Sequence, residues 1–313
     1  MFPQSHALKA LTPQDTLNIV RGSCVRHRFS RSNCTACFEI CPTNALIWTS
    51  DGLSWDKTLC QRCLLCSAVC PSGALRASEV SLVLLLHAVK DLDHPVLACH
   101  VAPKAQGHAR VPCLGLLADP ELLLSMLLAL GCDITLNLSD CIACQNHAVI
   151  IPLQKAVSQV NRLSGHRSVV ELVFDADKIN FKERNCNRRE FFNLFRKRSA
   201  QAGVRVVDRL KADDQQEAYG TKRLPERRQL FLQVLDLLAF SQEINKENLL
   251  PQRRTTNKCR QCTGCVGICP TGALHPPETS GDKPAFIAAK CVNCRLCEAF
   301  CPVAAIKVTS GLT

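Results

Sequence analysis

Cysteine spacing constrains this chain more than any other feature. Three runs share the pattern C-x2-C-x2-C-x3-C-P: Cys60, Cys63, Cys66 and Cys70 with Pro71; Cys259, Cys262, Cys265 and Cys269 with Pro270; Cys291, Cys294, Cys297 and Cys301 with Pro302. The two-residue spacers let three thiols of one tight loop converge on one centre. The fourth thiol begins the next segment, from which it can reach a neighbouring centre.

This pattern resembles that of the bacterial two-cluster ferredoxins, in which it holds 4Fe–4S clusters. The resemblance covers roughly a third of the chain, as two copies. It implies two clusters per copy, each bound by three thiolates of one run and the last thiolate of the other. In the C-terminal copy one cluster would use Cys259, Cys262, Cys265 and Cys301, and the other Cys291, Cys294, Cys297 and Cys269.

The first run departs from the pattern because Arg31 stands where its leading cysteine is expected. We expect residues 25–33 to form a short loop that brings Cys24 round as the missing ligand. The two N-terminal clusters would then use Cys24, Cys34, Cys37 and Cys70, and Cys60, Cys63, Cys66 and Cys41. A three-iron or labile cluster, with Cys24 as a free thiol, is the alternative.

After each Cys-Pro pair and two further residues comes an alanine followed by leucine or isoleucine, such as Ala74-Leu75 and Ala273-Leu274. We expect these side chains to pack against the clusters and exclude water. Structural zinc on paired C-x2-C units would not need four interleaved ligand sets or the recurring proline. Purely structural iron–sulfur clusters are a stronger alternative, although adjacent pairs favour electron transfer.

The number of cysteines indicates the cellular compartment in which this chain can work. The chain has 313 residues and 22 cysteines, of which the four clusters would use about 16. Cluster thiolates need a reducing compartment. We find no secretory signal in residues 1–22, and the apolar stretch 80–89 is too short to span a bilayer. The sequence therefore predicts a soluble cytoplasmic protein without a transmembrane segment.

The charge distribution is more informative than the total. Four clusters at about −2 each would lower the net charge from +11 to about +3. Residues 178–260 hold 20 lysines and arginines against 10 aspartates and glutamates, so this stretch alone carries +10. This stretch is either a surface that docks an acidic redox partner or a membrane, or it is a solvated connector. Because no recognised binding motif accompanies it, we do not expect nucleic-acid binding.

Between the ferredoxin-like modules, strands alternate with helices, which favours a parallel sheet. Asp119 and Pro120 predict the start of a helix that Gly131 ends. We expect strands at 95–99, 109–113, 133–138, 169–174 and 204–207, and further helices at 152–163 and 188–202. The fold class is therefore α+β multidomain, with two modules flanking a central α/β domain.

Four further cysteines fall at or just past the ends of these strands, where open α/β sheets bind ligands. They are Cys99, Cys113, Cys141 and Cys144. With Gly115, Asp119-Pro120-Glu121 and Gly131, they resemble the delta subunit of methyl-viologen-reducing hydrogenases. That resemblance implies a 2Fe–2S cluster on these four thiols. Inert core thiols, or a redox-active pair at Cys141 and Cys144, are the alternatives.

The predicted domains are an N-terminal extension at 1–23, the first module at 24–79, the central domain at 80–207, a basic helical connector at 208–257 and the second module at 258–313. In the connector, residues 226–240 form a helix whose apolar stripe packs on another domain, and residues 246–258 form a linker. Cys132 and Cys186 are bystanders, and the lone His147 is more typical of a core or surface group than of a ligand.

Together these features predict a polyferredoxin-like protein that relays single electrons for a partner oxidoreductase. A hydrogenase, a heterodisulfide-type reductase or a flavoprotein would fit, since no Gly-rich loop binds a flavin or nicotinamide in this chain. Two other functions stay open: a thiol or disulfide reductase that uses the central cysteines, and an iron–sulfur sensor or scaffold.

Overall fold

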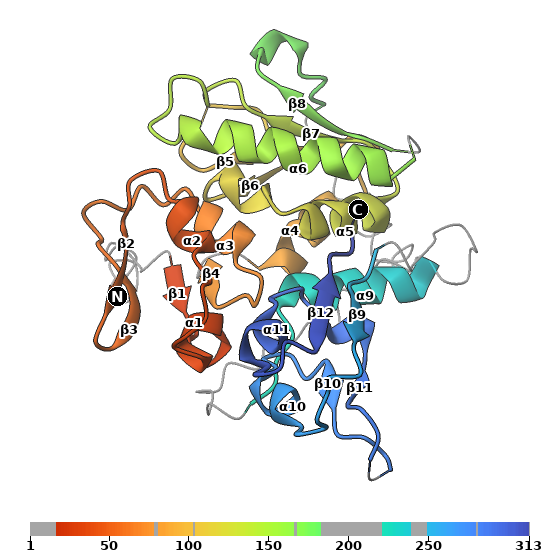
Figure 1. Ribbon diagram of the computed structural model, residues 1–313. Helices are drawn as coiled ribbons and strands as arrows, with labels where there is room; N and C mark the ends of the chain where they lie inside the picture. Colours follow the sequence, from red (N-terminus) through yellow and green to blue (C-terminus); the bar gives the residue numbers. More distant parts are fainter. Residues whose placement is uncertain are drawn as a thin grey trace, which may run out of the picture.

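The structure is a computed structural model that describes residues 17–77, 81–102, 104–165, 168–182, 221–238, 249–279 and 281–312. Figure 1 shows a parallel sheet at the top of the view, with one small cysteine-rich module below it on the left and a second at the bottom. The chain thus has a central region of mixed α/β content with a ferredoxin-type module on either side in the sequence.

The central sheet has four parallel strands in the order β6-β5-β7-β8. They are β5 (Val96–Cys99), β6 (Ala109–Val111), β7 (Ile134–Asn137) and β8 (Val170–Val173). All four lie within the strands predicted from the sequence. Because β5 is flanked by β6 and β7, the chain changes direction there, which creates the kind of edge at which open sheets bind ligands.

The helices around this sheet are α4 (Leu82–Val89), which contacts β6, α6 (Ile150–Leu163), which contacts β8, and α5 (Pro120–Leu130), which packs on α6. The Asp119 carboxylate caps α5 by accepting the backbone N–H of Glu121 at 2.9 Å, and Gly131 ends the helix at φ 65°. The helix α6 begins two residues before its predicted start, since Pro152 fits the first turn. The predicted helix 188–202 and strand 204–207 lie outside the described residues.

The helix α9 (Glu226–Leu238) packs on α5 and belongs to the central core. Leu230 and Phe231 of its predicted apolar stripe are fully buried. Arg227 and Arg228 at its start form ion pairs with Asp119 at 3.1 Å and Glu121 at 2.6 Å. This helix of the basic stretch thus packs on the central region, and neither arginine is available to an external acidic partner.

The first module contains two short antiparallel pairs, β1 with β4 and β2 with β3, around a small core of its own. Its elements are β1 (Leu17–Ile19), α1 (Val25–Arg28), α2 (Ala36–Glu39), β2 (Leu46–Thr49), β3 (Gly52–Trp55), α3 (Leu65–Val69) and β4 (Leu75–Ala77). A boundary at residue 24 leaves out β1, which pairs within the module.

The second module repeats this arrangement, with pairs β9–β12 and β10–β11. Its elements are β9 (Gln252–Thr255), α10 (Gly264–Ile268), β10 (Leu274–His275), β11 (Ala285–Phe286), α11 (Leu296–Phe300) and β12 (Ile306–Thr309). The linker predicted at 246–258 is wrong at β9, which is an antiparallel partner of β12. All four residues of Gln252–Thr255 are polar, so no apolar pattern in the sequence indicated this short edge strand.

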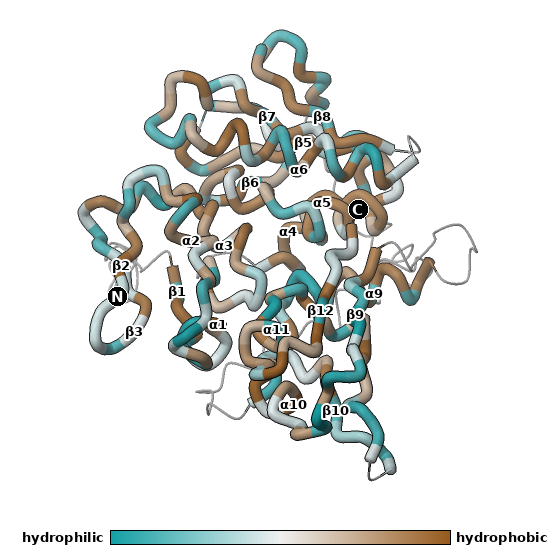
Figure 2. Tube along the Cα trace, viewed as in Figure 1, coloured by the Kyte–Doolittle hydropathy of each residue, from teal (hydrophilic) through white to brown (hydrophobic). Residues whose placement is uncertain are grey.

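Apolar residues concentrate where the central sheet meets its helices and α9 (Figure 2). Leu65 and Ala68 of α3 join the same core, so the first module and the central region share buried contacts. Among the described residues, no helix combines the length and apolar character needed to cross a membrane.

Candidate metal centres

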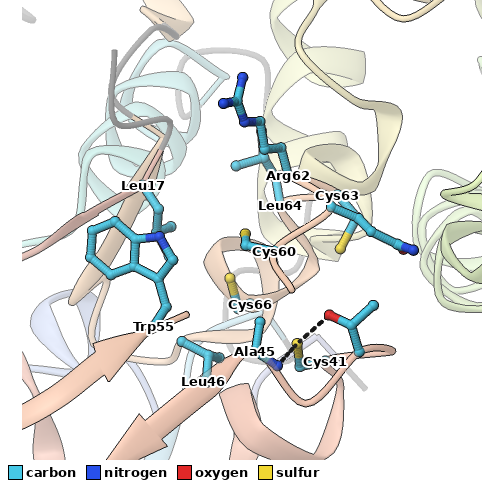
Figure 3. A pocket seen from close by; sticks show the side chains of 12 residues that line it. Leu17, Cys41, Ala45, Leu46, Trp55, Cys60, Arg62, Cys63, Leu64 and Cys66 are labelled. Atoms are coloured by element: carbon cyan, nitrogen blue, oxygen red, sulfur yellow. Dashed lines mark hydrogen bonds between the residues drawn. The ribbon is translucent and has the colours of Figure 1, made fainter. Parts of the chain in front are cut away.

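In the first module, four cysteines from both runs line one apolar cavity (Figure 3). Cys60, Cys63 and Cys66 come from one loop, and Cys41 comes from the other run. The remaining wall is largely apolar, with Leu17, Ala45, Leu46 and Trp55 among its residues. The interleaving implied by the ferredoxin resemblance is therefore present in the geometry.

A second cavity in this module is lined by Cys24, Cys34, Cys37 and Cys70. The predicted loop at 25–33 is wrong in part, because α1 forms directly after Cys24 and turns the chain back. Arg26 of this helix lies over the Trp48 ring at 4.5 Å and Arg28 is buried, so both hold α1 against the module. This packing brings the Cys24 thiol to the position that the incomplete run leaves open.

The second module places Cys269, Cys291, Cys294 and Cys297 around a cavity with Leu274 and Phe286. The remaining cysteines of this module are Cys259, Cys262, Cys265 and Cys301. Burial raises the pKa of Cys265, and the nearby charges of Cys262 and Cys259 raise it further, so these three thiols lie close together. Cys262 is exposed, so this site lies at the protein surface.

The three complete runs share an unusual backbone conformation. In each, the residues directly before and after the second cysteine have positive φ: Arg62 and Leu64, Gln261 and Thr263, Asn293 and Arg295, all between 51° and 62°. None is glycine, and each such residue costs of order 1–3 kcal/mol. This strained conformation directs successive N–H groups and thiols toward one point, as in anion-binding nests. The first run lacks it, since Thr35 has φ −123°.

All four Cys-Pro turns also match one another. The third residue after each cysteine has positive φ: Asn44 at 52°, Gly73 at 63°, Gly272 at 67° and Ala304 at 47°. In three of the turns the next backbone N–H donates to the cysteine sulfur, from Ala45 to Cys41, Ala74 to Cys70 and Ala305 to Cys301, each at 3.3 Å. These bonds stabilise a thiolate, and hydrogen bonds to sulfur tune cluster potentials.

The grouped thiols need a positively charged centre in order to ionise together. Burial raises the pKa of Cys37 to about 12, and the charges of Cys70, Cys34 and Cys24 contribute to this. Burial likewise raises the pKa of Cys297 to about 12, with the charges of Cys291 and Cys269 adding to it. Since iron binds the thiolate form, a metal cluster supplies the charge that such a group lacks.

The central cysteines come together at the carboxyl edge of the sheet. Cys99 ends β5, Cys113 follows β6, and Cys141 and Cys144 follow β7. Burial raises the pKa of Cys141 to about 12, and the charges of Cys99, Cys113 and Cys144 raise it further. The Cys141 thiol therefore lies near the other three, and Cys99, Cys113 and Cys141 are buried.

Sequence analysis missed one residue of this central site, Asn146. It is buried, its backbone N–H donates to the Cys144 sulfur at 3.4 Å, and its side-chain amide donates to the Cys113 sulfur at 3.7 Å. Its position two residues after Cys144 is the only sequence signal, and it is indistinct because asparagine is common in turns.

Three residues that the sequence predicted not to bind metal are Cys132, His147 and Cys186. The Cys132 thiol donates to the Leu92 carbonyl at 3.5 Å, His147 is exposed, and Cys186 lies outside the described residues. Within the part of the chain that the structure describes, no three thiol, imidazole or carboxylate groups are placed to hold one metal ion. Each thiolate of a 4Fe–4S cluster binds a different iron, so its ligands lie farther apart than those of one ion.

Comparison with known proteins agrees with this geometry. Residues 258–305 match the 4Fe-4S dicluster domain and residues 53–76 match the 4Fe-4S binding domain. Hydrogenase-4 component A of Escherichia coli is 43% identical over 42 residues, which is 13% of this chain and 20% of that protein. An uncharacterized ferredoxin of Methanocaldococcus jannaschii is 35% identical over 46 residues, which is 13% of this chain and 60% of that protein.

The matches therefore span less than two thirds of either relative, and no solved structure matches this chain. They nevertheless confirm the predicted ferredoxin resemblance at both ends of the chain. The chain therefore carries ferredoxin-type 4Fe–4S domains in two places along its sequence.

Proposed function

We propose that this chain relays single electrons through four 4Fe–4S clusters and one central 2Fe–2S cluster, as a subunit or partner of an oxidoreductase complex. The 4Fe–4S ligands would be Cys24, Cys34, Cys37 and Cys70; Cys41, Cys60, Cys63 and Cys66; Cys259, Cys262, Cys265 and Cys301; and Cys269, Cys291, Cys294 and Cys297. The 2Fe–2S ligands would be Cys99, Cys113, Cys141 and Cys144.

The observation that carries this proposal is that cysteines of neighbouring sites lie close enough for their charges to affect one another's pKa. Cys66 and Cys37 belong to different sites of the first module, yet the charge of Cys37 adds to the effect of burial in raising the pKa of the partly buried Cys66. In the second module, Cys265 affects the pKa of Cys297 in the same way. Burial raises the pKa of Cys113 to about 12, and the charge of Cys63, which belongs to the first module, raises it further.

When bound, such clusters accept and release one electron at a time, and the protein sets their potentials through hydrogen bonds, charge and solvent exposure. In this chain the alanine N–H groups after three of the Cys-Pro pairs, the apolar cavity walls and Asn146 would exert that control. No substrate chemistry is assigned to the chain itself. A hydrogenase, a heterodisulfide-type reductase or a flavoprotein would supply it.

The central cysteines do not favour a disulfide reductase. A catalytic thiol needs a lowered pKa, whereas burial raises that of Cys141 to about 12. Four converging thiols also exceed the two that a redox-active disulfide requires.

Anaerobic coulometric titration tests the relay. Reduction of the fully loaded protein should take up about five electrons per chain, one for each cluster. The alternative result is an uptake of two electrons at the central site. If that uptake disappeared when Cys141 and Cys144 were both replaced by serine, while the iron content stayed constant, the result would contradict the relay and favour a disulfide.

A further inference from the structure

The segment 221–228 touches both modules at equivalent turns. The backbone N–H of Arg223 donates to the Pro270 carbonyl at 3.0 Å, in the Cys-Pro turn of the second module. Arg227 donates to the Cys70 carbonyl and, at 3.1 Å, to the Pro71 carbonyl, in the corresponding turn of the first module. Two turns that are 199 residues apart in sequence are thus held by one short stretch of chain.

Close packing fixes this arrangement. A Cβ on Gly73 would lie 2.8 Å from Pro225, and one on Gly272 would lie 3.3 Å from Lys222. The Lys222 ammonium donates to the Val266 carbonyl at 3.2 Å, and the Phe29 and Phe300 rings of the two modules meet edge to face at 5.2 Å. The two modules therefore face each other across this segment.

Arg227 and Arg228 are adjacent in the sequence, and each interacts with a different side of the contact between the modules. Arg227 binds the loop that carries Cys70, through four backbone carbonyls, while its other partner is Asp119. Arg228 forms an ion pair with Glu121 at 2.6 Å, and it lies near enough to the second module for its charge to lower the pKa of Cys291, which burial raises. Since consecutive Cα atoms are about 3.8 Å apart, one helix start presents a cation to each module.

The surroundings of Arg228 are not fully satisfied by protein atoms. Its Nε and Nη1 are buried and have no hydrogen-bond partner among the described residues, and Glu121 Oε1 is also unpaired. Leaving buried charged donors unpaired is costly, so such groups commonly mark a function. A cluster with its thiolates carries about −2 and would add negative charge beside this guanidinium, which Glu121 pairs on one side only.

We propose that Arg227 and Arg228 form an electrostatic junction between the modules, at which each guanidinium raises the reduction potential of the inner cluster beside it. These inner clusters are those of Cys70 and Cys291, and electrons cross between the modules here. In the crossing, one cluster loses one electron and the other gains it, and no bond or proton changes. The inference rests on the proposed function, since it requires both clusters.

Potentiometric titration of the fully loaded protein, followed by electron paramagnetic resonance, tests this junction. Arg227→Gln and Arg228→Gln should each make one redox step, and not the same one, harder to reduce. At a fixed potential the reduced fraction of that step should fall at least tenfold relative to the oxidised fraction, a shift of about 59 mV. Lys155→Gln removes the same charge from the exposed face of α6 and should shift none.

A second pair of variants keeps the test decisive if an arginine variant does not fold. Asp119→Asn retains helix capping, and Glu121→Gln keeps the side-chain shape, yet each removes the carboxylate that offsets one arginine. Both should shift their steps in the opposite direction, toward easier reduction. Unchanged potentials in loaded carboxylate variants would overturn the junction, whereas absence of iron from the wild-type protein would overturn the proposed function.

Discussion

Gly115 lies directly against the backbone of Cys63. A Cβ on Gly115 would stand 2.2 Å from the Cys63 carbonyl oxygen and 2.9 Å from the Val149 side chain. Gly115 follows Cys113 by two residues, so this contact joins the central thiol site to a cysteine loop of the first module. Only a residue without a side chain permits so close an approach.

We predict that Gly115→Ala destabilises the loaded protein by about 1–3 kcal/mol, because the added methyl group must displace backbone atoms. Chemical denaturation under anaerobic conditions measures the change. Gly267→Ala is the matched control, since its Cβ would meet no atom within 4 Å. Equal stability of Gly115→Ala and the control would show that the two loops are not in contact.

Replacing Cys24 tests the incomplete first run. Cys24→Ser should lower the iron content by about four atoms per chain and remove one 4Fe–4S signal, because Cys24 lines the cavity with Cys34, Cys37 and Cys70. Cys132→Ser, which changes a thiol that donates to a backbone carbonyl, should leave the iron content unchanged. If Cys24→Ser also kept all its iron, Cys24 would be a free thiol beside a three-iron or differently ligated cluster.

The central site makes a separate prediction. Serine at both Cys141 and Cys144 should remove about two iron atoms per chain and leave about 16, since the four 4Fe–4S sites do not use these thiols. Asn146→Ala should retain the iron and lower the potential of this site, because the amide bond to the Cys113 sulfur is lost. Iron counts unaffected by the double substitution would instead identify inert core thiols.

The buried pair of Arg228 and Glu121 should couple strongly in stability. Arg228→Met alone should cost about 3–5 kcal/mol, because it leaves the Glu121 carboxylate buried without its partner. The double variant Arg228→Met with Glu121→Leu should recover much of that loss. Denaturant unfolding of both variants, with Lys155→Gln as a surface control, measures the coupling, and strictly additive losses would exclude it.

Local signals in the sequence were sufficient for much of the central region. Asp119, Pro120 and Gly131 fixed both ends of α5, and alternating apolar residues located β7. The same strand ends predicted that Cys99, Cys113, Cys141 and Cys144 would meet, because parallel strands bring their carboxyl ends to one edge.

Tertiary contacts decided what the sequence left open. The strand β9 is polar and short, so only its pairing with β12 reveals it. Arg227 and Arg228 look like two more charges of a basic stretch until α5 supplies Asp119 and Glu121. The packing of α1, which begins directly after Cys24, likewise depends on Trp48, which lies 24 residues after Cys24.

Iron and acid-labile sulfide, counted per chain in anaerobically purified protein, test the account most directly. Four 4Fe–4S clusters and one 2Fe–2S cluster predict about 18 irons with as many sulfides, and magnetic coupling between neighbouring clusters in the reduced state. A colourless protein, or one that holds zinc on these cysteines, would contradict it.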